Sequence, residues 1–245
     1  MKLLALDTST DACSAAVWRD GEIVAVYEHS PRAHTRLILP MVEQVLARSG
    51  IALGALDALA FGRGPGAFSG VRIAAGVAQG LALAAGLRLI PVSTLAALAQ
   101  QVYRRHGCER VLVAMDARMG EVYQGAFVIR AGLAELSGRE AVTAPEAVSL
   151  PAGVVDSGAA VLSAWSAAGS GWREYPLLRQ QFPACQAVYL DYLPAAEDML
   201  PLARAAFLRG DTVDVQEASP VYLRNKVAET TREREQRAGF SVSKS

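Results

Sequence analysis

The sequence predicts an α/β protein made of two related lobes, each with a mixed sheet flanked by helices. Apolar, strand-like runs alternate along the chain with segments of helical periodicity. A short apolar run that ends in aspartate and leads into a returning strand opens the chain at residues 2–19 and recurs at 110–129. At about 150 residues per domain, 245 residues allow one large domain or two modest ones.

The first half predicts a series of elements that begins with three antiparallel strands. The Asp20-Gly21 pair is a hairpin signal between the second and third strands. The hydroxyl of Ser93 is suited to cap a helix that continues to about residue 105. In order, we expect strands at 2–7, 13–19 and 22–29, a helix at 35–49, a strand at 58–61, a Gly/Pro-rich loop at 62–70, a helix at 71–85 and a strand at 87–92.

The second half repeats the opening pattern and then becomes less regular. We expect strands at 110–116 and 121–129, and a last helix at 196–209 that Gly210 ends. The domains predicted from this order are residues 1–105 and 106–225, with the last helix able to pack back on the first lobe. Residues 226–245 are charged and poor in apolar side chains, which predicts a mobile tail.

Composition excludes several classes of protein. Lys plus Arg and Asp plus Glu both number 24, so the chain lacks the basic excess of an independent nucleic-acid binder. The three cysteines, at positions 13, 108 and 185, are far apart, which favours the reducing cytoplasm over a disulfide framework or a thiolate zinc site. The most apolar stretch, 73–87, is shorter than the about 20 residues of a membrane span, so we expect no membrane association.

Two loops could hold phosphate. The loop 62–70 follows a strand and opens a helix, where free N–H groups bind anions, but it lacks the P-loop and dinucleotide patterns. The turn 7–10 combines a carboxylate with hydroxyls. The alternative is structural: glycines for a tight turn and close helix packing, and Asx-type hydrogen bonds in the turn. The candidate phosphate or nucleotide residues are Asp7, Thr8, Ser9, Gly64 and Gly66.

Catalytic and metal-binding motifs do not emerge from the sequence. The histidines His29, His34 and His106 have no metalloprotease spacing. Asp116 and Glu121 could form an acid/base pair, but a charged hairpin turn is the favoured reading. We therefore predict no catalytic residue and no metal ligand in this chain.

The two helices of the first lobe are more apolar than a one-sided core contact needs. The pattern at 35–49 spreads its apolar residues over a wide arc, and the pattern at 71–85 is apolar nearly all round. A lobe usually covers one face of such a helix. Either another chain covers the rest, which we favour, or the second lobe or last helix does. The candidate partner-binding residues are Leu37, Met41, Val45, Ile73, Val77 and Leu81.

Seven sequence blocks together resemble one known family. They are DTST at 7–10, GRGPGAFSGVR at 62–72, QGLAL at 79–83, VSTL at 92–95, MDARMGEVY at 115–123, PAAEDMLP at 194–201 and PVYLR at 220–224. In this order they are similar to the bacterial TsaB (YeaZ) family, over residues 1 to about 225. The resemblance implies a fold of the actin, sugar-kinase and Hsp70 type.

The resemblance also implies a function in forming threonylcarbamoyladenosine in tRNA. In that pathway the metal-dependent paralogue TsaD transfers the threonylcarbamoyl group, TsaB is its non-catalytic partner and TsaE is an associated ATPase. The family pairs through the first two helices of its N-terminal lobe, so we expect a TsaD-like partner there, or self-pairing when the chain is alone. Contact with tRNA is expected only through the complex. The chain itself would need no cofactor, with ATP or ADP at a complex interface and the metal in the partner. The alternatives are a nucleotide-binding regulatory module and a metallopeptidase-like hydrolase.

Overall fold

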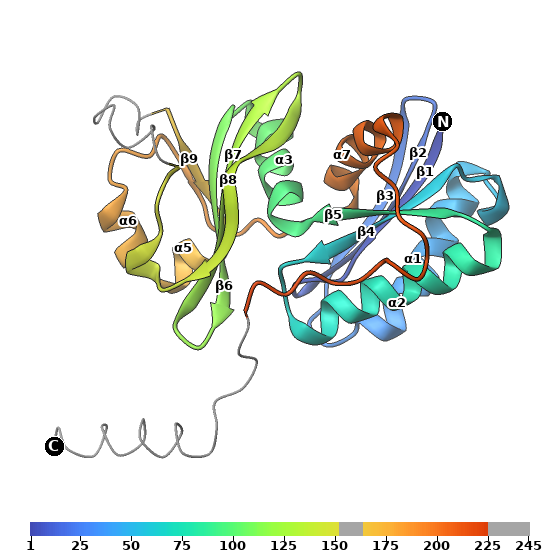
Figure 1. Cartoon of the computed structure of the whole chain (residues 1–245), viewed down its shortest axis with the longest axis horizontal. Coiled ribbons are helices and arrows are strands. Elements are labelled where there is room, and N and C mark those ends of the chain that lie inside the picture. Colours follow the sequence, from blue (N-terminus) through green and yellow to red (C-terminus); the bar gives the residue numbers. More distant parts are fainter. Residues whose placement is uncertain (152–163, 225–245) are drawn as a thin grey trace, which may run out of the picture.

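The computed structural model describes residues 1–151 and 164–224, and these form two α/β lobes (Figure 1). The tail predicted at 226–245 lies outside the described residues. The strands are β1 (Lys2–Asp7), β2 (Ala12–Arg19), β3 (Glu22–His29), β4 (Ala58–Gly64), β5 (Arg88–Ser93), β6 (Arg110–Arg118), β7 (Glu121–Arg130), β8 (Leu133–Thr143), β9 (Ser166–Ala168) and β10 (Val188–Tyr189). The α-helices are α1 (His34–Ser49), α2 (Phe68–Ala85), α3 (Thr94–His106), α5 (Gly171–Glu174), α6 (Leu177–Gln181) and α7 (Ala196–Arg209), and short 3-10 turns lie at Leu53–Ala55 and Pro145–Ala147.

Both lobes contain a five-stranded mixed sheet with the same order. The first sheet runs β3-β2-β1-β4-β5 and the second, read in the same sense, runs β8-β7-β6-β9-β10. In each, the first three strands along the chain pair antiparallel and the remaining two continue the sheet in parallel. The shared order confirms the predicted pair of related lobes. A duplicated sheet is also what the resemblance leads us to expect.

Helices α1 and α2 cover one face of the first sheet and α7 covers the other (Figure 1). The inner sides of α1 and α2 meet the sheet through fully buried side chains such as Ile38, Val45 and Ala78. Helix α7 places Met199 and Leu200 against the strands of the first sheet. The first lobe therefore has a core on each side of its sheet, and its second layer comes from the end of the chain.

Helix α3 packs on the second sheet, although its place in the sequence predicts that it belongs to the first lobe, residues 1–105. Ser93 caps it as predicted, accepting a hydrogen bond from the N–H of Ala96 at 3.2 Å. Its residues Leu95, Leu98 and Val102 lie in one core with strands of the second sheet. The chain thus passes into the second lobe at the start of α3, before β6.

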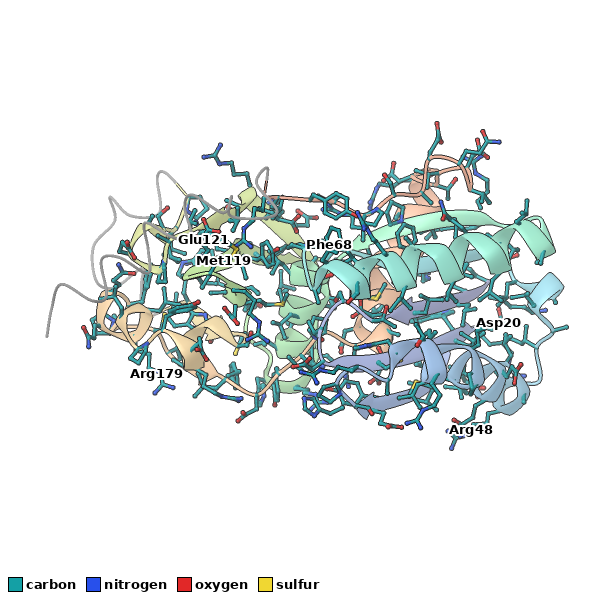
Figure 2. All side chains as sticks on the ribbon, turned by 90° about the horizontal axis from the view of Figure 1, so that it is seen from below. Asp20, Arg48, Phe68, Met119, Glu121 and Arg179 are labelled. Carbon is teal, nitrogen blue, oxygen red and sulfur yellow. The ribbon has the colours of Figure 1, made fainter. Side chains whose placement is uncertain are left out.

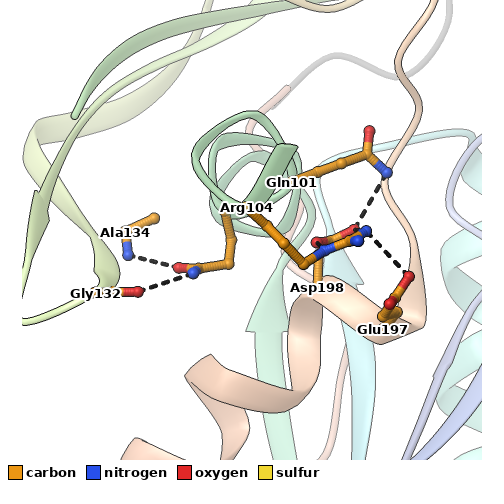
Figure 3. Close-up of polar contacts among 7 residues, drawn as sticks. Gln101, Arg104, Gly132, Ala134, Glu197 and Asp198 are labelled. Carbon is orange, nitrogen blue, oxygen red and sulfur yellow. Dashed lines mark hydrogen bonds and ion pairs between the residues drawn. The ribbon is translucent and has the colours of Figure 1, made fainter. Parts of the chain in front are cut away.

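A buried ionic contact joins α3 to α7 (Figure 3). The carboxylate of Asp198, which is 0% exposed, accepts from Nε of Arg104 at 2.7 Å and from Nε2 of Gln101 at 3.2 Å. Arg104 also pairs with Glu197 at 3.0 Å. Burial raises the pKa of Asp198, and Arg104 opposes that rise. The contact fixes the two helices that cross between the lobes.

The last described segment, residues 211–224, is an extended strap along α2 that ends on the second lobe (Figure 1). Nε2 of Gln79 donates to the carbonyls of Val215 and Ala218 at 3.0 and 2.9 Å. At its end, Nε of Arg224 donates to Glu121 at 2.9 Å. The strap therefore connects the helix layer of the first lobe to the β6–β7 hairpin of the second.

Candidate functional site

The turn after β1, residues 7–10, is enclosed by the protein itself. Asp7, Thr8 and Ser9 are 1%, 0% and 0% exposed. The Ser9 hydroxyl donates to Asp7 Oδ2 at 2.9 Å, and Thr8 Oγ1 donates to the carbonyl of Gly70 at 2.7 Å. The polar groups of these candidate phosphate ligands are thus hydrogen-bonded within the protein itself.

The glycine-rich loop packs directly on this turn. A Cβ at Gly62 would stand 1.9 Å from Asp7 Oδ1, one at Gly66 would stand 2.3 Å from the Ser9 carbonyl, and one at Gly70 would stand 2.1 Å from the Thr8 carbonyl. The N–H of Ala67 donates to the Ser9 carbonyl at 2.7 Å. The glycines are required for close backbone approach, which is the structural alternative of the sequence analysis. Gly64 serves the turn itself, with a φ of 96°.

Burial changes the acidity of Asp7. Desolvation raises its pKa from 3.8 to about 7, and the hydrogen bonds from Ser9 oppose that rise. Burial, with a contribution from the Asp7 charge, also raises the pKa of the Cys13 thiol to about 12. A carboxylate enclosed in this way belongs to the core, and a phosphate would reach it only if the loop moved away.

A cleft of about 380 Å³ lies between the two lobes beside the turn. The first lobe lines it with residues 9–11 and 66–68, the second with residues 115–118 and with Ser170, Arg173 and Glu174 at α5, and the strap with residues 221–224. Asp11, the residue that follows the turn, is exposed. The cleft is therefore separated from Asp7 by the packed loop and turn.

The two acids of the β6–β7 hairpin are engaged separately. Asp116 accepts from the Tyr175 hydroxyl at 3.0 Å and from the N–H of Arg118 at 2.9 Å. Burial is the larger cause, and the hydrogen bond to Asp116 the next, of a rise in the pKa of Tyr175 to about 12. Glu121 instead pairs with Arg224 of the strap. The hairpin thus has the character of a charged turn, with each carboxylate bound to its own partner.

The structure corrects part of the predicted partner-binding set. Met41 is 7% exposed and Val45 is 0% exposed, and both point into the core of the first lobe. A partner could not reach them on the folded lobe. The four remaining candidates pack on the edges of that core and are half-buried: Leu37, Ile73, Val77 and Leu81.

The exposed apolar face of α1 and α2 is formed by residues that neighbour the predicted ones on each helix surface. Leu83 on α2 is 75% exposed and Leu39 on α1 is 46% exposed. Gly76 and Gly80 are exposed, and a Cβ built on either would meet no atom within 4 Å. These residues were absent from the predicted set, although the four-residue spacing of 72, 76, 80 and 84 marks one helix row. Figure 2 shows α1 and α2 side by side at this surface.

Helix α2 is unusually apolar for the part of it that is buried. The mean hydropathy of this 18-residue helix is 1.3, yet only 33% of the helix is buried. Among the described residues it is the one helix long and apolar enough to cross a membrane by length and composition alone. Its inner row, which includes Ala74, Ala78 and Ala82, is nonetheless part of the lobe core.

Comparison with known proteins connects this geometry to a family. The family model described as TsaD, tRNA N6-adenosine threonylcarbamoyltransferase, matches residues 25–230. A protein of Escherichia coli (strain K12) named tRNA threonylcarbamoyladenosine biosynthesis protein TsaB is 48% identical over 230 residues, which cover 93% of this chain and 96% of that protein. A protein of the same name from Haemophilus influenzae is 43% identical over 234 residues, covering 93% and 95%.

Solved structures agree with the sequence relatives. YeaZ from Pseudomonas aeruginosa superposes with a TM-score of 0.81 at 47% identity, covering 90% of this chain and 100% of that one. Another structure from that organism, described as an uncharacterized protein with similarity to peptidase YEAZ, has a TM-score of 0.83 at 48% identity and covers 91% and 99%. The chain belongs to the TsaB (YeaZ) family of tRNA threonylcarbamoyladenosine biosynthesis proteins, which is related to TsaD.

Proposed function

We propose that this chain is a non-catalytic, activating subunit for threonylcarbamoyladenosine formation in tRNA. It pairs with a TsaD-like catalytic paralogue through the outer face of α1 and α2, and it cooperates with a TsaE-like ATPase. The observation that carries the proposal is the α2 face: exposed Gly76 and Gly80 beside Leu83, which is 75% exposed.

The chemistry of this face suits a helical partner. Glycines on an exposed helix row let a second helix approach closely, and ridges of its side chains can fill the grooves. Covering Leu83 and Leu39 removes apolar surface from water, at about 25 cal/mol per Å². A specific interface of about 1,600 Å² in total is the usual size for such a pair. In the absence of the partner the same face can pair with a second copy around a two-fold axis.

An accessory role leaves the metal, the nucleotide and the tRNA contact to other parts of the complex. Among residues 1–151 and 164–224, no three His, Cys, Asp or Glu side chains gather as a metal site would require. The Asp7 turn is filled by the protein's own loop. On the basis of the family relationship, we place the metal in the partner, ATP or ADP at an interface of the complex, and tRNA contact with the complex as a whole. The three free cysteines fit a cytoplasmic protein.

Activation must act through the partner's conformational equilibrium. A bound subunit raises a rate only if it binds the competent state of the enzyme more tightly than the other states. The α1/α2 face belongs to a lobe whose sheet, two helices and strap form continuous contacts. The chain is therefore suited to hold a partner helix pair in one arrangement.

The test measures pairing directly. The dissociation constant of the full chain with a purified TsaD-like paralogue is measured by calorimetry for the wild type and for Leu83→Asp. The aspartate would place an unpaired charge in the interface, and we expect binding to weaken about a hundredfold. Leu208→Asp, the same change at a position 61% exposed on α7, is the control and should bind as the wild type. Normal pairing by Leu83→Asp would refute the assignment of this face.

A further inference from the structure

Three side chains form an ordered stack on the surface at the start of α2. The guanidinium carbon of Arg72 lies 3.7 Å from the ring centroid of Phe68 and 5.7 Å from that of Tyr222. Nε of Arg72 donates to the Tyr222 hydroxyl at 2.9 Å, across 150 residues of sequence. Phe68 and Tyr222 are 48% and 46% exposed. Figure 2 shows Phe68 at the end of α2 that faces the second lobe.

The charge of Arg72 is not neutralised by a carboxylate in the parts of the chain that the structure describes. Two arginines of the cleft that Phe68 and Tyr222 line are paired with carboxylates: Arg224 with Glu121 and Arg118 with Asp116. The Tyr222 hydroxyl occupies Nε of Arg72, so the terminal nitrogens of the guanidinium remain available as donors. The stack therefore presents one oriented, uncompensated positive charge.

The stack continues the proposed docking face. Arg72 stands one helical turn before Gly76 and two before Gly80, so the three lie on one row of α2. A partner helix laid along the glycines would meet Arg72 at the edge of the contact. Aromatic residues and arginine are also the types that contribute most often to binding energy in protein interfaces.

We propose that the Arg72 stack is an anchor for a single carboxylate, carried by an aspartate or glutamate of the protein subunit that docks on α2. The proposal rests on the proposed function and adds the charge that the partner must present. A planar guanidinium, oriented by two rings and a hydroxyl, matches a carboxylate through two parallel hydrogen bonds. In the docked complex the flanking rings would shield that pair from water and thereby strengthen it.

An RNA backbone fits this surface less well. Three arginines line the cleft beside Phe68 and Tyr222, and each is already paired with a carboxylate: Arg118, Arg173 and Arg224. The same cleft also carries Asp11 and Glu174. A phosphodiester chain would bring repeated negative charges past these acids, whereas one carboxylate would meet Arg72 alone. The local balance of charge therefore favours a protein group over a nucleic acid.

The test compares binding of the TsaD-like paralogue by full-length variants, at low and at high sodium chloride. We expect Arg72→Gln to bind about tenfold more weakly at low salt, and Arg72→Glu to bind more weakly still. The affinity of Arg72→Gln should also depend less on salt than that of the wild type, because the ion pair is gone. Arg179→Glu, an exposed arginine on α6 far from α2 in Figure 2, is the control and should bind normally.

Two further variants make the outcome decisive. Tyr222→Phe keeps the ring but removes the hydroxyl that orients Arg72, and it should weaken pairing by a smaller factor in the same direction. Wild-type affinity and salt dependence in Arg72→Gln and Arg72→Glu would overturn the anchor, as would a loss confined to tRNA binding by the complex. Either result is separable from failure of the proposed function, because Leu83→Asp reports on the α2 face without Arg72.

Discussion

Replacing Asp7 by asparagine tests whether the family's opening motif is a core element or a ligand site. Asparagine has the shape of aspartate but carries no charge. Ser9 can still donate to its side-chain oxygen, as it now donates to Oδ2 at 2.9 Å. The change therefore removes the buried charge and leaves the packing against Gly62 in place.

The magnitude follows from the acidity of the folded protein. The pKa of Asp7 is raised from 3.8 to about 7 because burial disfavours the carboxylate. A raised pKa means that the folded state binds the proton more tightly than the unfolded state does. The stability that comes from protonated Asp7 is thus fully present below pH 3.8 and is lost as the pH rises through about 7. A rise of the pKa from 3.8 to about 7, at about 1.4 kcal/mol for each pH unit, corresponds to about 4 kcal/mol of stability.

The assay is urea unfolding of the wild type and Asp7→Asn across this pH range. We expect similar stability below pH 3.8 and an advantage for Asp7→Asn that approaches about 4 kcal/mol above pH 7. Asp11→Asn, the same change at an exposed position of the turn, controls for the loss of a surface charge. A pH-independent difference, or a variant that is less stable at high pH, would refute the reasoning about burial.

Further predictions concern packing, the ionic contact and the strap. Gly62→Ala would force a methyl group against Asp7, so it should lower the free energy of unfolding by about 3 kcal/mol or more and reduce the melting temperature. Gly76→Ala lies on an open helix surface and should raise the free energy of unfolding by about 1 kcal/mol. Arg104→Met leaves the buried carboxylate of Asp198 without its cation and should cost about 3 kcal/mol in urea unfolding, with the loss disappearing at acid pH where Asp198 is protonated. Gln79→Leu removes both hydrogen bonds to the strap and should speed amide exchange there while β1 stays protected; unchanged exchange in the strap would show that Gln79 does not hold it.

Local chemistry made much of the first lobe predictable. The strands at its start carry clear apolar runs, and the Asp20-Gly21 turn, the Ser93 cap and Gly210 at the end of α7 are signals that act over a few residues. Each of these three signals is stabilised by hydrogen bonds or backbone conformations within one turn of the chain. Signals of this short range can be read from the sequence before the surroundings of the element are known.

The second lobe shows where that reasoning stops. Strand β9 is three residues, Ser-Ala-Ala, and β10 is two, so neither has a pattern of its own. Strand β9 exists because β6 offers it a parallel edge at Val111–Val113. The strap is similar, since Gln79 holds it from more than 130 residues away in sequence. Contacts of this range leave no local periodicity.

The direction in which α2 faces could not be read from its composition. A helix that is apolar nearly all round gives no preferred side, so Val77 and Leu81 were as plausible as Leu83. Packing on the sheet determines the orientation: Ala74 and Ala78 are buried on the inner side of α2, and Leu83 is left exposed. The four-residue spacing of Gly76 and Gly80 was a local signal for the outer row, because glycine adds nothing to a core.

The central claim is that the chain acts by pairing through the α2 face, and one reconstituted assay tests it most directly. Threonylcarbamoyladenosine formation is measured with tRNA, threonine, bicarbonate, ATP and the other pathway proteins. This chain is omitted, supplied as the wild type, or supplied as Leu83→Asp. Our account predicts product with the wild type and a yield with Leu83→Asp close to that of omission. Equal yield without the chain, or full yield with a Leu83→Asp protein that does not pair, would contradict it.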